Sequence, residues 1–402
     1  AIMQLVEEGK LRLDVPVRDY LPWFRPEAHN EWPSIQVRHL LYQTSGLTEM
    51  GLDAEPHANA TLDEAVRTLN RARRDYPPGE RFCYFNLNYT VLGLLIERIS
   101  GMTFPEYIKQ YIFNPLDMTD SSMVSEAGSG ISTALGHGVL FGFPYPQTTK
   151  RNAYSGPSGG LITTAEDVSA YMAVHLNGGR SPKTGGRIIS KESLRSLHVP
   201  GIGTSEAGYA MGWITGRYND RTLLRHGGSL PGYRSFLWLL PEEEIGIAVL
   251  MNQNGFLPAM LAYSSIPEGL AALTTGGAPR RAFSLRLLYW GMTATAILLL
   301  LKHVHWWLWR YPRLRRAIAA GTRQSRLGAH IGGALMELLI AVSLIVAVPP
   351  VTESLLERNM TWKLGFQMAP GVMTIIWIVI ITACMRGLGK LHILYTMKFF
   401  RD

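Results

Sequence analysis

Three long apolar segments in the last third of the chain place the strongest constraint on its fold. They cover approximately residues 283–302, 331–350 and 363–385. Each is close to the roughly 20 apolar residues that an α-helix needs to cross the hydrocarbon core of a bilayer. The sequence therefore predicts three transmembrane α-helices in a membrane domain over residues 276–402, with the lipid bilayer as a partner.

The excess positive charge lies in the same region. Residues 1–279 contain 23 Lys and Arg against 27 Asp and Glu, whereas residues 280–402 contain 16 against 4. Basic side chains beside long apolar helices are typical of membrane proteins rather than of proteins that bind phosphate backbones. We therefore attribute the formal charge of +8 to membrane association and predict no nucleic-acid partner.

The loops between the apolar segments predict the orientation of the chain in a cell membrane. The first loop contains no acidic residue, whereas the second loop contains both signs of charge. By the positive-inside rule the first loop and the C-terminal tail are cytoplasmic, and residues 1–275 are extracytoplasmic. The basic residues of the first loop are Lys302, Arg310, Arg313, Arg315, Arg316, Arg323 and Arg326.

Polar and aromatic residues close to these segments have simple membrane explanations. Trp306, Trp307 and His303 suit the interface between lipid and water. Glu337 lies inside the second segment, where a carboxylate is costly and an intramembrane function is the usual explanation. Because Glu337 is near one end of its segment, pairing with a neighbouring helix or snorkelling explains it equally well.

Residues 1–275 mix helical and extended patterns without an internal repeat. Helical spacing of apolar residues is clear at 88–101 and 163–179, whereas the strand-like runs gather after these helices. Residues 242–244 form a short charged turn between two of these runs, which predicts an antiparallel hairpin. Helices followed by an antiparallel meander predict an α+β fold.

A Tyr-x-Asn sequence, Tyr84 and Asn86, stands just ahead of the helical run at 88–101. By themselves these two positions are typical of a turn and a helix cap. Their surroundings, "YPPGERFCYFNLNYTVLGLLIERISG", resemble the Pro-Gly-x-x-Phe-x-Tyr-Ser-Asn-x-x-Tyr-x-x-Leu-Gly stretch of the penicillin-recognising serine hydrolases. This family includes class C β-lactamases, D-alanyl-D-alanine carboxypeptidases and related esterases.

Other stretches resemble the same family in the expected order. "IQVRHLLYQTSGL" is similar to its Ile-Thr-x-Arg-His-Leu-Leu-x-His-Thr-Ser-Gly-Leu segment, and "PSGGLITTAEDVSAYM" to its Gly-Gly-Leu-x-Ser-Thr-x-x-Asp-Leu segment. The resemblance spans residues 1–255. It implies a β-lactamase-like domain over residues 1–275, with an antiparallel sheet flanked by helices and a helical subdomain.

The resemblance implies roles for two residues ahead of the helix. Tyr84 matches the family's tyrosine, which acts as general base and acid beside a lysine ammonium that favours phenolate. Asn86 matches the asparagine whose amide holds that lysine and the acyl carbonyl of the substrate. Phe85 stands where the family usually has serine, which removes a hydroxyl group but no assigned catalytic group.

A third motif, "RHGGSLPGYRSF", matches the family's His/Lys-x-Gly strand. It assigns His226 to the catalytic site and Gly227, Gly228 and Ser229 to substrate binding, with the Ser229 N–H as an oxyanion-hole donor. Strong β-lactamases of the family more often have Lys-Thr-Gly here. Because His226 is only partly charged near neutral pH, efficient β-lactam hydrolysis is less expected than esterase or peptidase chemistry.

The family nucleophile, a Ser-x-x-Lys pair, is expected just upstream of Ala1. The first residues, "AIMQLVEEGKL", have the pattern of a helix that is already under way, and they resemble the helix that follows Ser-x-x-Lys in the family. We therefore expect the chain to be a fragment that lacks the first strands and the nucleophile of its domain. As printed it is expected to be inactive.

Other catalytic or metal sites are disfavoured. "GPSGG" fits a Gly-x-Ser-x-Gly elbow around Ser158, but its surroundings are turn-like and the His-Gly-Gly sequence follows it instead of preceding it. His39, His137 and His175 fit no zinc-ligand spacing, and the two cysteines, Cys83 and Cys384, suggest neither a disulfide framework nor a metal site. No metal or cofactor is predicted.

The sequence thus favours a bacterial, multi-pass membrane protein with an extracytoplasmic serine hydrolase domain. Acyl-enzyme chemistry on peptidoglycan-type peptides, D-amino-acid amides, esters or β-lactams is the first hypothesis. A non-catalytic, membrane-anchored protein that binds or senses wall peptides is the alternative, and transport by the membrane helices is a weaker third. The oligomeric state is left open by the sequence.

Overall fold

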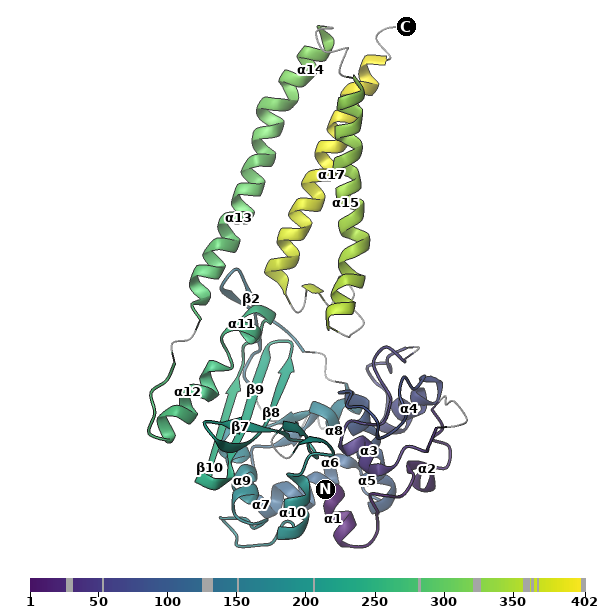
Figure 1. Ribbon diagram of the computed structural model, residues 1–402, viewed down its shortest axis with the longest axis vertical. Coiled ribbons are helices and arrows are strands. Elements are labelled where there is room, and N and C mark those ends of the chain that lie inside the picture. Colours follow the sequence, from purple (N-terminus) through teal and green to yellow (C-terminus); the bar gives the residue numbers. More distant parts are fainter. Residues whose placement is uncertain are drawn as a thin grey trace. The chain divides into compact units, whose positions relative to one another are not determined.

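The chain forms two compact units in the computed structural model (Figure 1). An N-terminal unit contains residues 1–137, 146–254 and 263–281, and a membrane unit contains residues 138–145, 255–262 and 282–402. The described residues are all except 27–31, 53, 125–132, 150–151, 205–206, 281–282, 321–326, 357–361, 363–364, 367–368 and 399–402. Arg323 and Arg326 of the predicted cytoplasmic loop lie outside the described residues.

The N-terminal unit is built on a six-stranded antiparallel sheet in the order β10-β9-β8-β7-β6-β5. The predicted hairpin is β9 and β10, in which Leu240 pairs with Ile245 across the turn. The turn contains Glu244 in the left-handed conformation, at φ 54°. The strands are β5 (Ile202–Thr204), β6 (Ala207–Tyr209), β7 (Ile214–Tyr218), β8 (Arg221–Leu230), β9 (Tyr233–Leu240) and β10 (Ile245–Met251).

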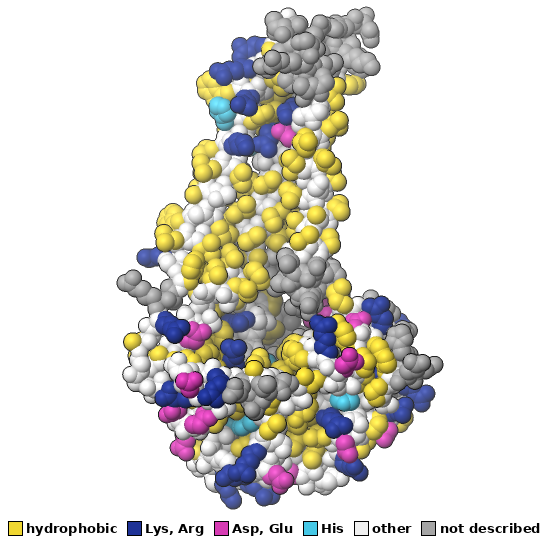
Figure 2. Space-filling view, in the orientation of Figure 1, with side chains coloured by type: hydrophobic (Ala, Val, Ile, Leu, Met, Phe, Trp, Pro, Cys, Tyr) yellow, Lys and Arg dark blue, Asp and Glu magenta, His cyan; other side chains and the backbone are white. Residues whose placement is uncertain are grey.

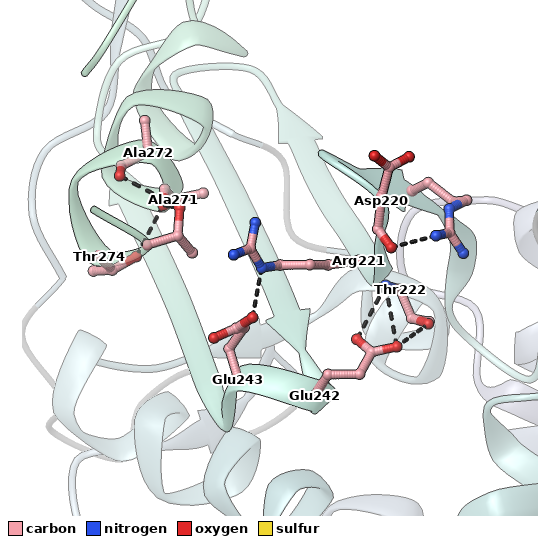
Figure 3. Close-up of polar contacts among 10 residues, drawn as sticks. Asp220, Arg221, Thr222, Glu242, Glu243, Ala271, Ala272 and Thr274 are labelled. Carbon is pink, nitrogen blue, oxygen red and sulfur yellow. Dashed lines mark hydrogen bonds and ion pairs between the residues drawn. The ribbon is translucent and has the colours of Figure 1, made fainter. Parts of the chain in front are cut away.

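The charged turn of this hairpin holds the beginning of β8 (Figure 3). The Arg221 guanidinium lies 2.5 Å from a Glu243 carboxylate oxygen. The Thr222 N–H donates to the Glu242 carboxylate at 3.0 Å, and the Thr222 hydroxyl donates to it as well. These bonds connect the β9–β10 turn to β8, so that the three strands are fastened at one end.

Helices pack on the sheet and also form a separate helical subdomain. In that subdomain α5 is central, with Val91, Leu94 and Leu95 fully buried. It begins at Asn86 and ends where Gly101 adopts φ 73°. The helices of the unit are α1 (Ile2–Glu7), α2 (Val17–Tyr20), α3 (Val37–Leu41), α4 (Leu62–Thr68), α5 (Asn86–Ser100), α6 (Phe104–Ile108), α7 (Asn114–Leu116), α8 (Gly156–Gly159), α9 (Ala165–Leu176), α10 (Lys191–Leu197) and α12 (Ser265–Thr274).

The predicted α+β class is confirmed by this arrangement. Helices α9 and α12 both pack against β10, and short strands β1 (Ser122–Met123) and β4 (Leu161–Ile162) pair outside the main sheet. The sequence Thr61-x-x-Glu64 is typical of a capping box, and the structure has this capping box at the start of α4. The Glu64 N–H donates to Thr61 Oγ1 at 3.2 Å, and the Thr61 N–H donates to the Glu64 carboxylate at 2.9 Å.

The membrane unit consists of long apolar helices together with a hairpin and a short helix. The long helices are α13 (Leu285–His305), which continues through a π-helix η6 (Trp306–Arg310) into α14 (Tyr311–Ala319), α15 (Leu327–Leu356) and α17 (Pro370–Lys398). The hairpin is β2 (His137–Leu140) with β3 (Phe143–Pro146), and the short helix is α11 (Phe256–Leu261). Apolar side chains cover the visible face of the long helices (Figure 2).

Four stretches, not three, are long and apolar enough to cross a membrane. They are Phe256–Thr274, Leu285–Ala317, Ile331–Thr352 and Pro370–Ile393. The additional stretch, Phe256–Thr274, contains α11 and α12, which are separated by a turn. Sequence analysis missed it because two prolines and this turn interrupt its apolar pattern, and one of its helices, α12, packs on β10 of the N-terminal unit.

Glu337 is paired with a neighbouring helix, which is one of the two explanations considered for it. Its Oε1 lies 3.1 Å from Lys390 Nζ, and the two residues belong to α15 and α17. These helices approach closely through small residues, since Ala334 and Ala341 are fully buried and a Cβ at Gly387 would lie 3.1 Å from the Ala334 carbonyl oxygen. Such contacts are typical of packed membrane helices.

A pair of histidines, of which His175 is buried and His198 is partly buried, lies between α9 and the end of α10. His175 Nδ1 and His198 Nε2 are 2.9 Å apart, so one ring donates a proton to the other. The His175 ring also contacts Trp213 edge to face, with 5.0 Å between the ring centroids. Burial lowers the pKa of His175 to about 3 and that of His198 to about 4. Both rings are therefore neutral in the folded protein near pH 6.

Acidification below about pH 6.5 is expected to destabilise the N-terminal unit. The unfolded histidines take up protons near their ordinary pKa of 6.5, whereas the folded ones do not until about pH 4, so the free energy of unfolding falls between these values. Each histidine contributes up to about 1.4 kcal/mol per pH unit. Melting temperatures measured at pH 7 and pH 5 check this.

The variant His198→Gln is expected to lose less stability between pH 7 and pH 5 than the wild type. The matched control is His57→Gln, because His57 is exposed. An equal pH dependence in His198→Gln and the wild type would contradict the assignment of this effect to the buried pair.

Candidate active site

Two motifs from the sequence meet at one edge of the sheet. Strand β8 pairs with β9 from Leu224 to Leu230, but β7 reaches only as far as Arg225, which pairs with Ile214. Beyond Arg225 the side of β8 that faces away from β9 is therefore not covered by β7. The segment 226–230, which contains the His-Gly-Gly motif, lies along this edge.

The structure brings Tyr84 to the same edge. The ring of Tyr84 is 6.3 Å from that of His226, measured between centroids. Tyr84 also contacts Tyr209 edge to face at 6.1 Å, and the Tyr209 hydroxyl lies 3.4 Å from His226 Nε2. Tyr84, Tyr209 and His226 thus form one cluster between the segment before α5 and the edge of β8.

Sequence analysis missed Tyr209. It lies on β6, in a run that was recognised only as a possible strand, and no motif includes it. Its place in the cluster depends on β6 and β7 ending beside the edge of β8, which is a long-range feature. No local signal in the sequence indicates it.

Asn86 and Ser229 are placed on the accessible side of the site. Asn86 is exposed at the first position of α5, two residues after Tyr84, whose side chain is 44% exposed. Ser229 is exposed on β8, and its hydroxyl accepts a hydrogen bond from Asn254 Nδ2 at 2.9 Å. Tyr84, Asn86 and Ser229 are therefore all accessible to a molecule in solution.

Glycine is needed at position 228 for strand pairing as well as for the ligand access that the motif predicts. A Cβ at this position would lie 2.6 Å from Ser235 Oγ, on the paired strand β9. A contact this short excludes any larger side chain unless Ser235 moves. The glycine therefore lets β8 and β9 pair here, besides leaving room for a ligand as the motif predicts.

Gln43 holds the segment that carries Tyr84. Its backbone carbonyl accepts a hydrogen bond from the Cys83 N–H at 2.8 Å, and its side-chain Oε1 accepts one from the Phe85 N–H at 3.1 Å. Both neighbours of Tyr84 are therefore bonded to one residue. Gln43 is 1% exposed and adopts φ 58°, a left-handed conformation that is uncommon for residues other than glycine.

The Gln43 side chain also joins a buried network. Asn88 Nδ2 donates to Gln43 Oε1 at 2.6 Å, and the Ser45 hydroxyl donates to Asn88 Oδ1 at 2.8 Å. This network connects the loop after α3 to the first turn of α5. One signal is that Gln43 stands where the family pattern has histidine, but no local pattern indicates its partners.

The titratable groups of the site are neutral near pH 7. Burial raises the pKa of Tyr84 above its ordinary value of 10, and burial also raises the pKa of Tyr209. Burial lowers the pKa of His226, against a smaller opposing effect of a hydrogen bond that the ring donates to the Gly227 backbone. A smaller fraction of the His226 imidazole is therefore protonated near pH 7 than the sequence alone leads us to expect. Tyr84 needs a neighbouring cation to serve as a base.

The disfavoured nucleophile, Ser158, is engaged elsewhere. Its hydroxyl donates to the Ser155 carbonyl at 3.2 Å within the four-residue helix α8, and Pro157 of the same helix packs against α5 at Gly93. Among the described residues, no strand leads directly into this helix as a strand does in a nucleophile elbow. These contacts favour a structural role for Ser158 over a role as nucleophile.

Each of the three histidines considered as metal ligands makes a separate contact within the protein. His39 Nδ1 accepts a hydrogen bond from the Gln36 N–H at 3.2 Å at the start of α3, and His175 belongs to the buried pair. His137 Nδ1 lies 3.3 Å from the Asn252 carbonyl oxygen. Among the described residues, no group of three or more His, Cys, Asp or Glu side chains is arranged to hold a metal ion.

Comparison with known proteins decides the family. The profile of the beta-lactamase family matches residues 1–264. The chain belongs to this family. The predicted relationship to the penicillin-recognising serine hydrolases is confirmed, and the fold of the N-terminal unit is that of the family.

Two curated proteins are similar to this chain over most of its N-terminal two thirds. Protein flp of Staphylococcus aureus (strain N315) is 30% identical over 267 residues, which are 65% of this chain and 52% of that protein. Penicillin-binding protein 4 of Amycolatopsis lactamdurans is 27% identical over 261 residues, which are 62% of this chain and 68% of that protein. This chain thus spans about half the length of the staphylococcal relative.

A solved structure agrees with this placement in the beta-lactamase family. The octameric penicillin-binding protein homologue from Pyrococcus abyssi superimposes with a TM-score of 0.58 at 29% identity. The match covers 71% of this chain and 65% of the other. The family and its fold are those of serine hydrolases of the beta-lactamase type.

Replacement of Gln43 by alanine is expected to lower the free energy of unfolding by roughly 2–4 kcal/mol. The change leaves the buried Phe85 N–H and the Asn88 amide without their acceptor, and each such loss costs about 1–3 kcal/mol. Urea unfolding followed by tryptophan fluorescence checks this. The matched control is Gln110→Ala at an exposed position, and similar midpoints for the two variants would contradict the role of Gln43.

Proposed function

We propose that the protein is a membrane-anchored serine hydrolase that cleaves an acyl bond through an acyl-enzyme. The observation that carries the proposal is the position of Tyr84, which lies 6.3 Å from His226 at the edge of β8 that β7 leaves uncovered. In a chain of the beta-lactamase family this is where a proton-transfer group and a substrate-binding strand are needed. The exposure of Tyr84, Asn86 and Ser229 supports access of a substrate to that edge.

The nucleophile in this proposal is a serine of a Ser-x-x-Lys pair that precedes Ala1 in the whole protein. Its hydroxyl oxygen attacks the acyl carbon while Tyr84 takes the hydroxyl proton. Tyr84 then returns that proton to the leaving nitrogen or oxygen as the acyl bond breaks. Water attacks the acyl-enzyme in the second half of the reaction and restores the serine.

The remaining residues of the site have roles in orientation and charge. The lysine ammonium counteracts the effect of burial on the Tyr84 phenol and favours the phenolate. The Asn86 amide holds the lysine and the acyl carbonyl. The Ser229 N–H donates to the oxyanion that forms on the carbonyl oxygen, where preorganised donors stabilise the transition state most.

The substrate class we propose is wall peptides, D-amino-acid amides or small esters rather than typical β-lactams. The position that carries a permanent charge in strong β-lactamases is occupied by His226, and burial lowers the pKa of His226. A neutral imidazole offers a weaker partner for the carboxylate of a β-lactam than an ammonium does. Gly227 also lacks the hydroxyl that Thr supplies in Lys-Thr-Gly.

Labelling of the full-length native protein tests the proposal. A fluorophosphonate probe is expected to form an adduct on a serine that precedes Ala1 and is followed three residues later by lysine, as located by peptide mass mapping. In Tyr84→Phe the rate of labelling is expected to fall roughly 10²- to 10⁴-fold, because the proton acceptor is lost. The matched control Tyr111→Phe, at a partly exposed tyrosine, is expected to label normally.

The opposite result would favour the binding or sensor alternative. If neither the fluorophosphonate nor a penicillin labels the native protein, and the upstream serine or lysine is missing, acyl transfer is excluded. Wall-peptide binding to the unlabelled protein would then become the leading hypothesis.

We further propose that the N-terminal unit is extracytoplasmic and the loop that includes α14 is cytoplasmic, as the basic residues suggest. In a variant without Cys83 and Cys384, a cysteine introduced at the exposed Lys191 is expected to react with a membrane-impermeant maleimide in intact cells. A cysteine introduced at Arg315 is expected to react only after the membrane is permeabilised. Labelling of Arg315→Cys in intact cells would reverse the orientation.

A further inference from the structure

The membrane unit contains a group of polar side chains contributed by all three of its long helical segments. Glu337 comes from α15, Arg386 and Lys390 come from α17, and His303 and Trp307 come from α13 and η6. We call these five residues the cation cluster. They lie within stretches that are otherwise apolar enough to cross a membrane. The inference concerns this cluster and does not depend on the proposed hydrolase function.

Two cations share one carboxylate in the cation cluster. Glu337 Oε1 lies 3.1 Å from Lys390 Nζ and 3.6 Å from Arg386 Nε. The side chains are only 17% exposed for Arg386 and Lys390 and 21% exposed for Glu337. The ion pairs therefore leave one positive charge in excess at a largely enclosed position, where an uncompensated charge is costly in a membrane.

Close packing brings α13 and η6 to this position. A Cβ at Gly389 would lie 3.0 Å from the Trp307 ring and 3.1 Å from the Trp306 ring, so a larger residue would require these rings to shift by a few tenths of an ångström. Gly389 is in the same turn of α17 as Arg386 and Lys390. His303 is near enough to Arg386 to interact with its charge, and its ring centroid is 6.3 Å from that of Trp307.

Several buried polar atoms of the cluster are not hydrogen bonded. Three nitrogen atoms, Arg386 Nε, His303 Nδ1 and Trp307 Nε1, and one oxygen atom, Glu337 Oε2, have no hydrogen-bond partner among the described residues. Leaving a buried polar group unpaired costs about 1–3 kcal/mol, and more for a charged group. Nitrogen donors around an excess positive charge would be satisfied by one anionic group that carries several oxygen atoms.

The position of the cluster along the helices indicates which anion is available. Lys390 is three residues from Ile393, the end of its apolar stretch, and Glu337 is six residues from Ile331, the start of its own. At 1.5 Å per residue these positions lie about 5 and 9 Å inside the ends of the stretches. Lys and Arg side chains gather at this end of the membrane helices, near α14 (Figure 2).

We propose that the cation cluster binds the phosphate group of an anionic phospholipid. Arg386 and Lys390 supply the charge, and Arg386, His303 and Trp307 supply N–H donors to the phosphate oxygens. A phosphodiester is the anion that a bilayer presents at this depth, and basic pockets between membrane helices are suited to such headgroups. Glu337 orients the two cations and reduces their net charge.

Native mass spectrometry of the full chain in a neutral detergent tests the proposal. The probes are dioleoyl phosphatidylglycerol, dioleoyl phosphatidylcholine and inorganic phosphate. The wild type is expected to bind phosphatidylglycerol at least about tenfold more tightly than phosphatidylcholine, a difference of about 1.4 kcal/mol. Both lipids carry a phosphodiester, but the choline cation of phosphatidylcholine cancels its charge and is repelled by the excess positive charge of the cluster. Equal binding of the two lipids would overturn the proposal.

Two sets of variants separate a specific site from general attraction to positive charge. In Arg386→Gln with Lys390→Gln the preference for phosphatidylglycerol is expected to disappear. The matched control is Arg315→Gln with Arg316→Gln, which removes the same charge from exposed positions of α14 and is expected to keep the preference. Equal losses in the two double variants would overturn the proposal.

The variant Glu337→Gln distinguishes a lipid site from an ion pair that only fastens α15 to α17. Removal of the carboxylate raises the excess charge, so phosphatidylglycerol is expected to bind several-fold more tightly. Unchanged or weaker binding would overturn the proposal, and this variant decides the question if the Arg386 and Lys390 double variant does not fold. Displacement of the lipid by millimolar inorganic phosphate would assign the same site to soluble phosphate, whereas retention would assign it to lipid.

Discussion

The hydrogen bonds that Gln43 makes to both neighbours of Tyr84 are the interaction on which the candidate site depends. They fix the backbone from Cys83 to Phe85, and through Asn88 they also fix the start of α5. The phenol of Tyr84 reaches the edge of β8 only because this short segment is held in one conformation. A residue with no catalytic role in the proposal thus positions Tyr84, the proposed proton-transfer group.

Local patterns predicted a large part of the fold. The β9–β10 hairpin, the capping box of α4 and the apolar membrane helices depend on residues that are neighbours in sequence, so short windows contain the needed information. The motif residues Tyr84 and His226 could be named for the same reason. Tyr209 and the partners of Gln43 could not, because their contacts join strands and loops that are more than a dozen residues apart. The fourth apolar stretch was missed because a turn divides it.

The two units manage charge in different ways. At the candidate site, burial keeps the Tyr84 phenol and the His226 imidazole neutral, and any charge there has to come from a further residue or a substrate. In the membrane unit, the Glu337 carboxylate lies within ion-pair distance of Arg386 and Lys390, which belong to a neighbouring helix. Burial therefore favours the neutral forms of titratable groups in one unit, whereas in the other unit the charged groups lie together as ion pairs.

The chain passes between the two units five times, because residues 138–145 and 255–262 belong to the membrane unit although both lie within the N-terminal two thirds of the sequence. A domain that is joined to the rest of its chain by one connection can be separated from it by one cut. Here a cut near residue 280 would leave a fragment that still contains the hairpin and α11. A single cut near residue 280 therefore does not divide the chain along the boundary between its two units.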